Sequence, residues 1–281
     1  MRFRKDAELD TSQVSDRRGM RGMGLPVAGG GGIVGIIVLL LSLYLNSGGG
    51  GAPSINGISL GGEEGDLSAE CRTGEDANQR QDCRIVGVVD SVQAYWGQRH
   101  PGYTKSTTVF FTGQTNTGCG LASSDVGPFY CPVDQKVYID LGFYDDLRNR
   151  FGATGGPFAE AYVIAHEYGH HVENLMGLLA QGQGGATGPN SAGVHIELLA
   201  DCFAGMWAKG AIDTGFIEDI TDADIQDGLD AAAAVGDDRI QQKTQGQVDP
   251  ESWTHGSAEQ RQSHFLIGFR QGSVEACQSA S

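Results

Sequence analysis

Residues 157–171 read Pro-Phe-Ala-Glu-Ala-Tyr-Val-Ile-Ala-His-Glu-Tyr-Gly-His-His, an apolar, helix-forming run that ends in a cluster of ionisable side chains. The cluster contains the pattern H-E-x-x-H as His166, Glu167 and His170. Residues four apart share one face of a helix, so the two imidazoles can reach a single metal ion. Glu167 follows at the rim of that face, whereas His171 points away from it. The stretch therefore predicts a helix that carries a metal site.

The flanks of the motif also suit a helix. Pro157 is compatible with a first helical turn, and no residue from Ala161 to Ala165 is charged. Gly169 inside a helix costs about 1 kcal/mol of helix stability, so we expect another backbone or a ligand to approach closely there. The motif is typical of zinc-dependent hydrolases, in which the glutamate accepts a proton from a water molecule at the metal.

A catalytic zinc site takes a third protein ligand and leaves its fourth position to water. The segment Ile196-Glu-Leu-Leu-Ala-Asp-Cys-Phe-Ala-Gly205 predicts a second apolar helix, with Glu197 and Asp201 four residues apart on one face. We assign Glu197 as the third ligand and Asp201 as the acceptor that orients a ligand histidine through its other ring nitrogen. The two roles can also be exchanged. One zinc ion per chain, held by His166, His170 and Glu197, is the expected cofactor.

At these residues the chain resembles the neutral zinc metallopeptidase family of bacteria. The resemblance rests on the helix motif and on three later segments in the same order, namely 197–205, 236–241 and 254–261. It implies a zincin-like fold in the gluzincin arrangement, with the Glu of the E-x-x-x-D segment as third ligand. The expected function is a zinc-dependent endopeptidase in which Glu167 activates the attacking water. The alternative is a catalytically idle, zinc-stabilised binding or quality-control module at the cell surface.

His255 is a further catalytic candidate. It lies just before Ser257, which is expected to cap a helix, and it can donate a hydrogen bond to the oxyanion that forms during hydrolysis. More often, a residue in this position only braces the start of the helix. Tyr162 and Tyr168 are other candidates, and the run 237–239, Asp-Asp-Arg, can be explained by an internal ion pair.

Residues 25–45 contain no charged side chain and, at 1.5 Å per residue, would span about 31 Å, the thickness of a bilayer core. Arginines precede this span and a Gly-rich stretch follows it, so the positive-inside rule places the N-terminus in the cytoplasm. We therefore expect a single-pass cell-membrane protein with its catalytic domain outside the cytoplasm; a cleaved signal peptide is the alternative. The expected parts are a cytoplasmic segment 1–24, a transmembrane anchor 25–45, a flexible tether 46–70 and a zinc metallopeptidase domain 71–281.

All six cysteines lie beyond the expected span, and their even number suits disulfides in an oxidising compartment. Fifteen connectivities are possible. Two local loops and one long link would give the pairs Cys71–Cys83, Cys119–Cys131 and Cys202–Cys277. The chain contains no C-x-x-C pair, which argues against a cysteine metal site.

The remaining pattern indicates an α+β domain. Helical spacing runs from residue 84 to 96, strands are expected at 107–111, 129–131 and 136–141, and helix-start boxes occur at 221–224 and 257–260. The expected architecture is mostly helical, with a small antiparallel or mixed sheet beside the zinc helices. A net charge of −16 argues against a nucleic-acid partner and leaves a peptide or protein substrate as the expected partner.

Overall fold

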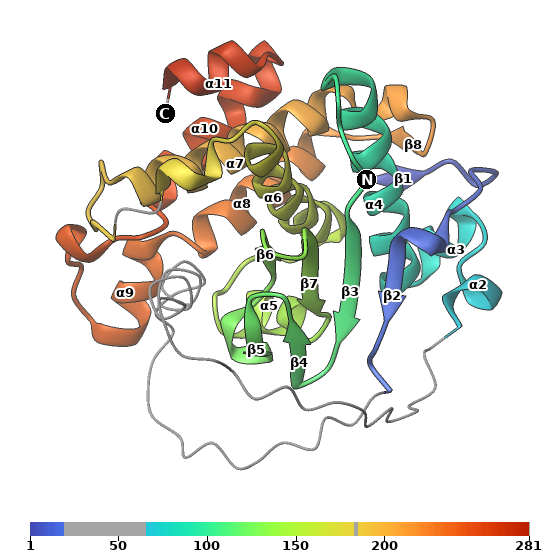
Figure 1. Ribbon diagram of the computed structural model, residues 1–281, viewed down its shortest axis with the longest axis horizontal. Coiled ribbons are helices and arrows are strands. Elements are labelled where there is room, and N and C mark those ends of the chain that lie inside the picture. Colours follow the sequence, from blue (N-terminus) through green and yellow to red (C-terminus); the bar gives the residue numbers. More distant parts are fainter. Residues whose placement is uncertain (20–65, 183–184, 281) are drawn as a thin grey trace.

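The computed structural model describes residues 1–19, 66–182 and 185–280 (Figure 1). Its helices are α2 (Leu67–Glu70), α3 (Gly74–Gln79), α4 (Gln81–Arg99), α5 (Phe143–Asn149), α6 (Pro157–Leu175), α7 (Ala192–Gly210), α8 (Asp222–Ala234), α9 (Asp237–Gln245), α10 (Ala258–Gln271) and α11 (Val274–Ala280). Its strands are β1 (Arg2–Phe3), β2 (Val14–Asp16), β3 (Thr107–Phe111), β4 (Gln114–Thr117), β5 (Gly120–Ser123), β6 (Phe129–Cys131), β7 (Lys136–Asp140) and β8 (Ile217–Asp219). The described chain is thus α+β, as the sequence predicts.

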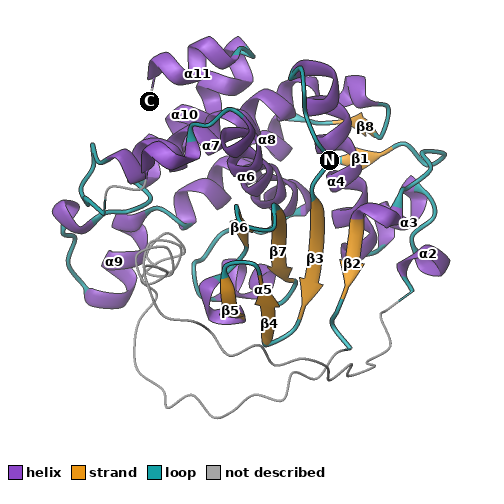
Figure 2. Ribbon diagram, in the orientation of Figure 1, coloured by secondary structure: helices purple, strands orange, loops and turns teal. Residues whose placement is uncertain are grey.

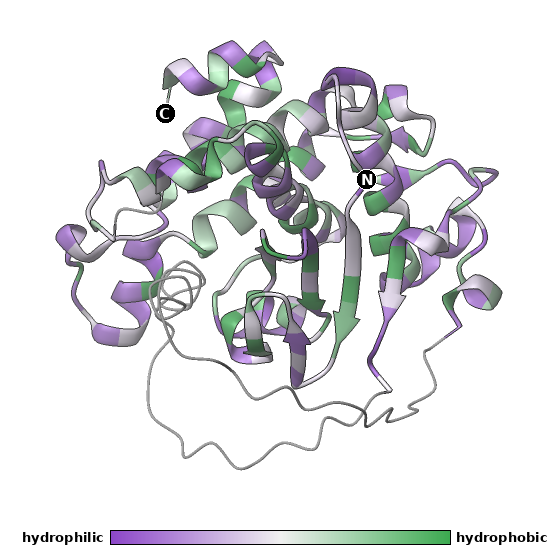
Figure 3. Ribbon diagram, in the orientation of Figure 1, coloured by the Kyte–Doolittle hydropathy of each residue, from purple (hydrophilic) through white to green (hydrophobic). Residues whose placement is uncertain are grey.

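The main sheet is mixed and has the strand order β2-β3-β7-β6. Strand β3 runs parallel to β2 and β7, whereas β6 is antiparallel to β7. Alternate residues of these strands face two different hydrophobic clusters, because successive side chains of a strand point to opposite faces. Phe110 and Ile139 join the main core with the helices, while Val109 and Tyr138 join a smaller cluster with Ala122 of the β4–β5 hairpin. In Figure 3, green segments on β7 mark its hydrophobic residues.

The long helices pack together on one side of the sheet (Figure 2). Helix α6 is central, because it contacts α4, α7 and α8 as well as strands β6 and β7. The two expected helix-start boxes are present: Thr221 and Asp224 cap α8, and Ser257 and Gln260 cap α10. The expected metal ligands on α6 therefore lie at the centre of the helical layer.

Helices α7 and α10 touch backbone to backbone. A Cβ atom at Gly205 would lie 2.0 Å from the carbonyl oxygen of Phe265, and one at Gly268 would lie 1.9 Å from that of Cys202. Only glycine permits such an approach. The structure also contains the disulfides Cys71–Cys83, Cys119–Cys131 and Cys202–Cys277, the pairing expected from the sequence, and the last of them links α7 to α11.

The N-terminal residues belong to the same folded body as the long helices. Strand β1 pairs with β8, and β2 forms the edge of the main sheet beside β3. Phe3 is buried in the main core against Gly87 of α4. The expectation that this segment lies on the cytoplasmic side of a membrane, apart from the rest of the chain, is therefore wrong, because strands of one sheet cannot lie on opposite sides of a bilayer.

The expected membrane span also requires correction. Within residues 1–19, 66–182 and 185–280, no helix combines the length and the apolar composition needed to cross a membrane. The expected span, residues 25–45, lies outside the described residues. The prediction of a transmembrane helix in front of the domain, and with it that of a single-pass membrane protein, is contradicted by the sheet, because β1 and β2 precede the expected span and pair with strands that follow it.

Candidate metal centre

The N-terminus of helix α6 is held by a side chain of α8. Asp227 of α8 accepts hydrogen bonds from the backbone N–H groups of Gly156 and Ala159, at 2.9 and 2.8 Å. A carboxylate at a helix N-terminus satisfies free N–H groups and interacts favourably with the helix dipole. From this start, two and a half turns carry the motif residues into the protein interior, where His166 and His170 are both buried.

Helix α7 meets α6 at Gly169. A Cβ atom on this glycine would lie 2.9 Å from both the Cα atom and the carbonyl oxygen of Ala200. The expectation that another backbone approaches Gly169 closely is therefore confirmed. Because the two helices touch here, the side chain of Glu197, one turn before Ala200, faces the histidines of α6.

The three expected metal ligands form one buried group. Nε2 of His166 lies 3.2 Å from Oε2 of Glu197, and Nε2 of His170 lies 3.4 Å from Oε1 of the same carboxylate. One ligand atom from each of the three residues lies within 4.8 Å of the other two. Two imidazole nitrogens and one carboxylate are the donor set of many catalytic zinc sites.

Each histidine of this group contacts a second carboxylate through its other ring nitrogen. Nδ1 of His166 is 2.9 Å from Oδ1 of Asp201, and Nδ1 of His170 is 2.8 Å from Oε2 of Glu173. Such contacts hold a proton on Nδ1 and direct Nε2 of each ring toward a metal. In this arrangement Glu197, and not Asp201, faces both Nε2 atoms.

Asp201 is itself held by Arg261 of α10, which the sequence analysis did not single out. Nε and Nη2 of Arg261 donate to the two oxygens of Asp201 at 2.8 and 3.1 Å, and the hydroxyl of Tyr162 donates to the same carboxylate. Burial raises the pKa of Asp201, but Arg261 and His166 lower it to about 2. Asp201 therefore remains an ionised acceptor for the His166 ring.

The electrostatics of the site favour a cation. Burial lowers the pKa of His166, whereas Asp201 and Glu197 raise it, to about 9. The carboxylates of Glu173 and Glu197 likewise raise the pKa of His170 against the effect of burial. At both histidines the carboxylates raise the pKa more than burial lowers it, so the local potential is negative. A divalent cation in place of the protons would balance this negative charge.

Glu167 is buried beside this group, and one of its oxygens has no partner. Its side chain is 5 % exposed, and Oε2 has no hydrogen bond within the described residues. Burial raises the pKa of this carboxyl, while His166 and His170 act in the opposite direction. An unpartnered buried polar atom is costly, and it is common where a substrate, ion or water binds.

His255 lies on a loop that Asp237 of α9 fixes. Oδ2 of Asp237 accepts the backbone N–H groups of Thr254, His255 and Gly256, and Oδ1 lies 3.2 Å from Nδ1 of His255. Burial lowers the pKa of His255, but Asp237 and the nearby Glu197 raise it. The expected ion pair of residues 237–239 is thus replaced by a carboxylate–histidine contact beside the metal group.

The side chains of Tyr168 and His171 have structural partners. The Tyr168 hydroxyl contacts Oγ1 of Thr108 in β3 at 3.0 Å. His171 contacts the Tyr130 hydroxyl and the carbonyl oxygen of Thr104, on the side of α6 away from the metal group. Neither faces Glu197, in line with the expectation that His171 is no metal ligand.

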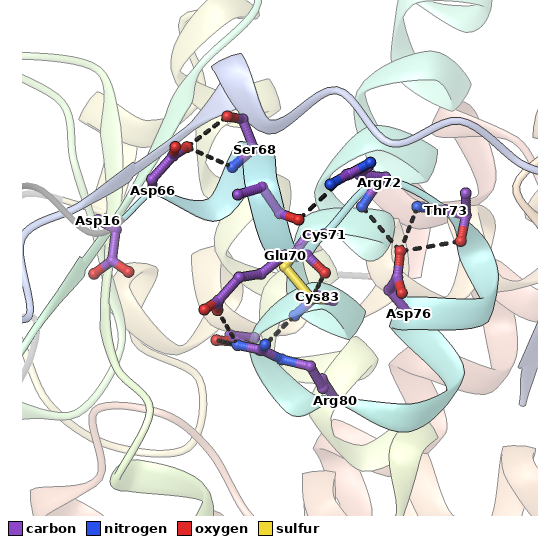
Figure 4. Close-up of a disulfide and its surroundings, with 12 residues drawn as sticks. Asp16, Asp66, Ser68, Glu70, Cys71, Arg72, Thr73, Asp76, Arg80 and Cys83 are labelled. Carbon is purple, nitrogen blue, oxygen red and sulfur yellow. Dashed lines mark hydrogen bonds and ion pairs between the residues drawn. A yellow bond between two sulfur atoms is a disulfide. The ribbon is translucent and has the colours of Figure 1, made fainter.

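A second group of potential ligands, Cys71, Asp82 and Cys83, is not available for a metal. Its two sulfur atoms are bonded to each other, as Figure 4 shows. Around this disulfide, Arg80 pairs with Glu70 and Asp82. A cysteine ligand must be a thiolate, so within the described residues the His-His-Glu group stands as the candidate site.

The chain is similar to known proteins over most of its length. The profile of the family described as "Putative neutral zinc metallopeptidase" matches residues 1–280. The chain belongs to this family. The uncharacterized protein Rv2575 of Mycobacterium tuberculosis is 54% identical over 223 residues, 77% of this chain and 76% of that protein. The uncharacterized protein YpfJ of Escherichia coli K12 is 38% identical over 296 residues, 98% of each chain. No solved structure gives a significant match.

Membership of this family suggests zinc-dependent peptidase activity, and the residues present fit zinc. The donors are imidazole and carboxylate, which zinc accepts in tetrahedral sites. Both Nε2 atoms face the Glu197 carboxylate, and Oε2 of Glu167 has no hydrogen bond to any described residue. Burial of the Glu197 and Glu167 carboxylates without a cation would cost free energy of folding.

Proposed function

We propose that this protein is a zinc-dependent endopeptidase that hydrolyses peptide bonds in peptide or protein substrates. One observation carries the proposal: the buried, unpartnered oxygen of Glu167 lies in the electrostatic field of His166, His170 and Glu197. A metal site that served only stability would need no such carboxylate, because burying it without a partner costs free energy.

His166, His170 and Glu197 would hold the zinc ion, which lowers the pKa of water and polarises the carbonyl of the bond to be broken. Glu167 takes a proton from the attacking water as the water oxygen bonds to the carbonyl carbon. The same carboxyl group then gives that proton to the amine as the C–N bond breaks. Burial raises the pKa of this carboxyl, which favours the uptake of the proton from water.

His255 is proposed to stabilise the oxyanion. With Nδ1 held by Asp237, its Nε2–H can donate to the carbonyl oxygen as that oxygen gains negative charge. Asp201 is proposed to fix the ring of His166 so that Nε2 keeps its direction during turnover. All of these side chains come from α6, α7, α9 and the loop before α10, so the site depends on the packing of the helical layer.

Peptide cleavage by the zinc-loaded protein tests this proposal. A library of mixed synthetic peptides is incubated with wild type and with Glu167→Gln, and the products are identified by mass spectrometry. We expect wild type to cleave, a chelator to stop it and zinc to restore it. Glu167→Gln should be at least about 100-fold slower while its zinc content is unchanged. Equal rates for the two proteins, or no cleavage by zinc-loaded wild type, would contradict the proposal.

A further inference from the structure

The two histidines of the metal group have unequal surroundings. Asp201, behind His166, receives hydrogen bonds from Arg261 and from the Tyr162 hydroxyl, so its charge is balanced within the protein. Glu173, behind His170, contacts Nδ1 of the His170 ring at 2.8 Å, and this is its side-chain contact within the described part of the chain. Within the described residues, no lysine or arginine forms an ion pair with Glu173, and its Oε1 has no hydrogen bond.

Glu173 is also completely buried, on the last turns of α6. A buried carboxylate with one oxygen unpartnered and no lysine or arginine beside it should destabilise the fold. Glutamine would fit the same volume, would still accept the Nδ1–H of His170 through its amide oxygen, and would carry no charge. A carboxylate at this position is therefore suited to a cation that is bound on the other side of the His170 ring.

We propose that Glu173 is a positioning residue for His170, and that its negative charge, transmitted through the His170 ring, strengthens zinc binding at the expense of the stability of the fold. This inference rests on the proposed function, because it requires zinc to bind at His170. The carboxylate holds the Nδ1 proton, which directs Nε2 toward the metal and makes the ring a better donor. Arg261 cancels much of this effect at Asp201, so Glu173 is the stronger contributor of the two.

A purely structural role makes a different prediction. If Glu173 only ties down the end of α6 through its contact with a helix neighbour three residues away, its loss should lower stability and leave zinc affinity unchanged. Glu160 provides a matched control for this case. It is a buried glutamate on the same helix, but Arg84 contacts it at 2.8 Å and it lies away from the metal group.

The test compares Glu173→Gln, Glu173→Leu and Glu160→Gln with wild type. Zinc affinity is measured by competition with a coloured chelator, and the thermal midpoint is measured in excess chelator. For Glu173→Gln we expect zinc affinity to fall at least about tenfold, with an equal or higher thermal midpoint. Glu173→Leu, which also removes the acceptor of the ring proton, should lose more. Glu160→Gln should lower the midpoint and keep the zinc affinity of wild type.

The outcomes separate the inference from the function on which it rests. Unchanged zinc affinity in Glu173→Gln, or an affinity loss that only accompanies a lower midpoint in chelator, would overturn the role of Glu173 while wild type still binds zinc. If wild type itself binds no zinc at this site, the proposed function fails, and the inference fails with it.

Discussion

At the scale of single residues, His255 allows the proposed chemistry to be separated from metal binding. It lies outside the ligand group, and Asp237 holds its Nδ1. If its Nε2–H stabilises the oxyanion, His255→Ala should lower kcat by about 100- to 1,000-fold with little change in KM. Steady-state kinetics on one peptide substrate, together with zinc analysis, measure this. Zinc loss in the variant, or an unchanged kcat, would assign His255 a structural role instead.

Asp90 on α4 is a second buried carboxylate with a testable consequence. It accepts hydrogen bonds from the backbone N–H of Asp10 at 2.8 Å and from the side chain of Gln13, which also contacts the Asp10 carboxylate. Burial raises the pKa of Asp90 to about 7, and the charges of Asp10 and Lys105 act on it in opposite directions. The group therefore holds a proton in the folded protein that it releases on unfolding.

Because the folded-state pKa of Asp90 lies above the ordinary value of 3.8, the folded protein binds more protons than the unfolded one between these pH values. The contribution of Asp90 to stability must then fall as the pH rises from about 4 to about 7. Asp90→Asn should remove a slope of up to about 1.4 kcal/mol per pH unit. Urea unfolding of both proteins in chelator, at several pH values, measures the difference. A difference that does not vary with pH would refute this reading.

At the scale of helices, Gly169 decides how closely α6 and α7 approach. On helix propensity alone, Gly169→Ala would stabilise the protein by about 1 kcal/mol. The added Cβ atom, however, would lie 2.9 Å from two backbone atoms of Ala200, which cannot move aside as a flexible side chain can. We expect a net destabilisation of about 1–3 kcal/mol and weaker zinc binding, because Glu197 is displaced with α7.

Gly97 on α4 is the control for this substitution. A Cβ atom there meets nothing closer than Tyr103 at 4.0 Å, so Gly97→Ala should follow helix propensity and stabilise the protein. Denaturant unfolding of both variants gives the two free energies. A stabilising Gly169→Ala would show that the two helices are not in backbone contact.

The helices show why part of the site could be predicted from the sequence. His166, Glu167 and His170 repeat at helical spacing within one element, and Glu197 and Asp201 do so within another, so periodicity alone places them on two faces. Arg261, Asp237 and Glu173 were missed. The first two act on other elements: Arg261 contacts Asp201, 60 residues away, and Asp237 contacts the loop 17 to 19 residues after it. Glu173 lies three residues after His170 in an apolar helix, and this spacing could have indicated it.

At the scale of the whole molecule, the role of the N-terminal residues could not be predicted. Strands β1 and β2 contain two and three residues, too few to show an alternating pattern. Their partners, β8 and β3, lie far along the chain. The long uncharged stretch at 25–45 instead predicted a membrane span, with the N-terminal segment and the domain on opposite sides. The pairing of β1 and β2 with later strands contradicts this topology. The disulfide pairing, in contrast, could be predicted from the sequence, because two pairs of cysteines are each 12 residues apart and leave only Cys202 and Cys277 to pair.

Phe3 tests whether these residues are part of the fold. Its ring is buried in the main core, in contact with Gly87 of α4. Phe3→Ala should lower the free energy of unfolding by about 3–5 kcal/mol, the range for a buried aromatic residue. Substitution of the exposed Lys5 by alanine should change it by less than about 0.5 kcal/mol. Denaturant unfolding measures both, and equal small effects would contradict the described N-terminal packing.

The central claim is that His166, His170 and Glu197 bind one zinc ion. Anomalous X-ray scattering on both sides of the zinc absorption edge, from crystals of the zinc-loaded protein, tests it most directly. We predict one peak per chain, about 2.0–2.2 Å from Nε2 of each histidine and from a carboxylate oxygen of Glu197. A zinc-loaded crystal with no peak between these three side chains, or with its peak at other residues, would contradict the account.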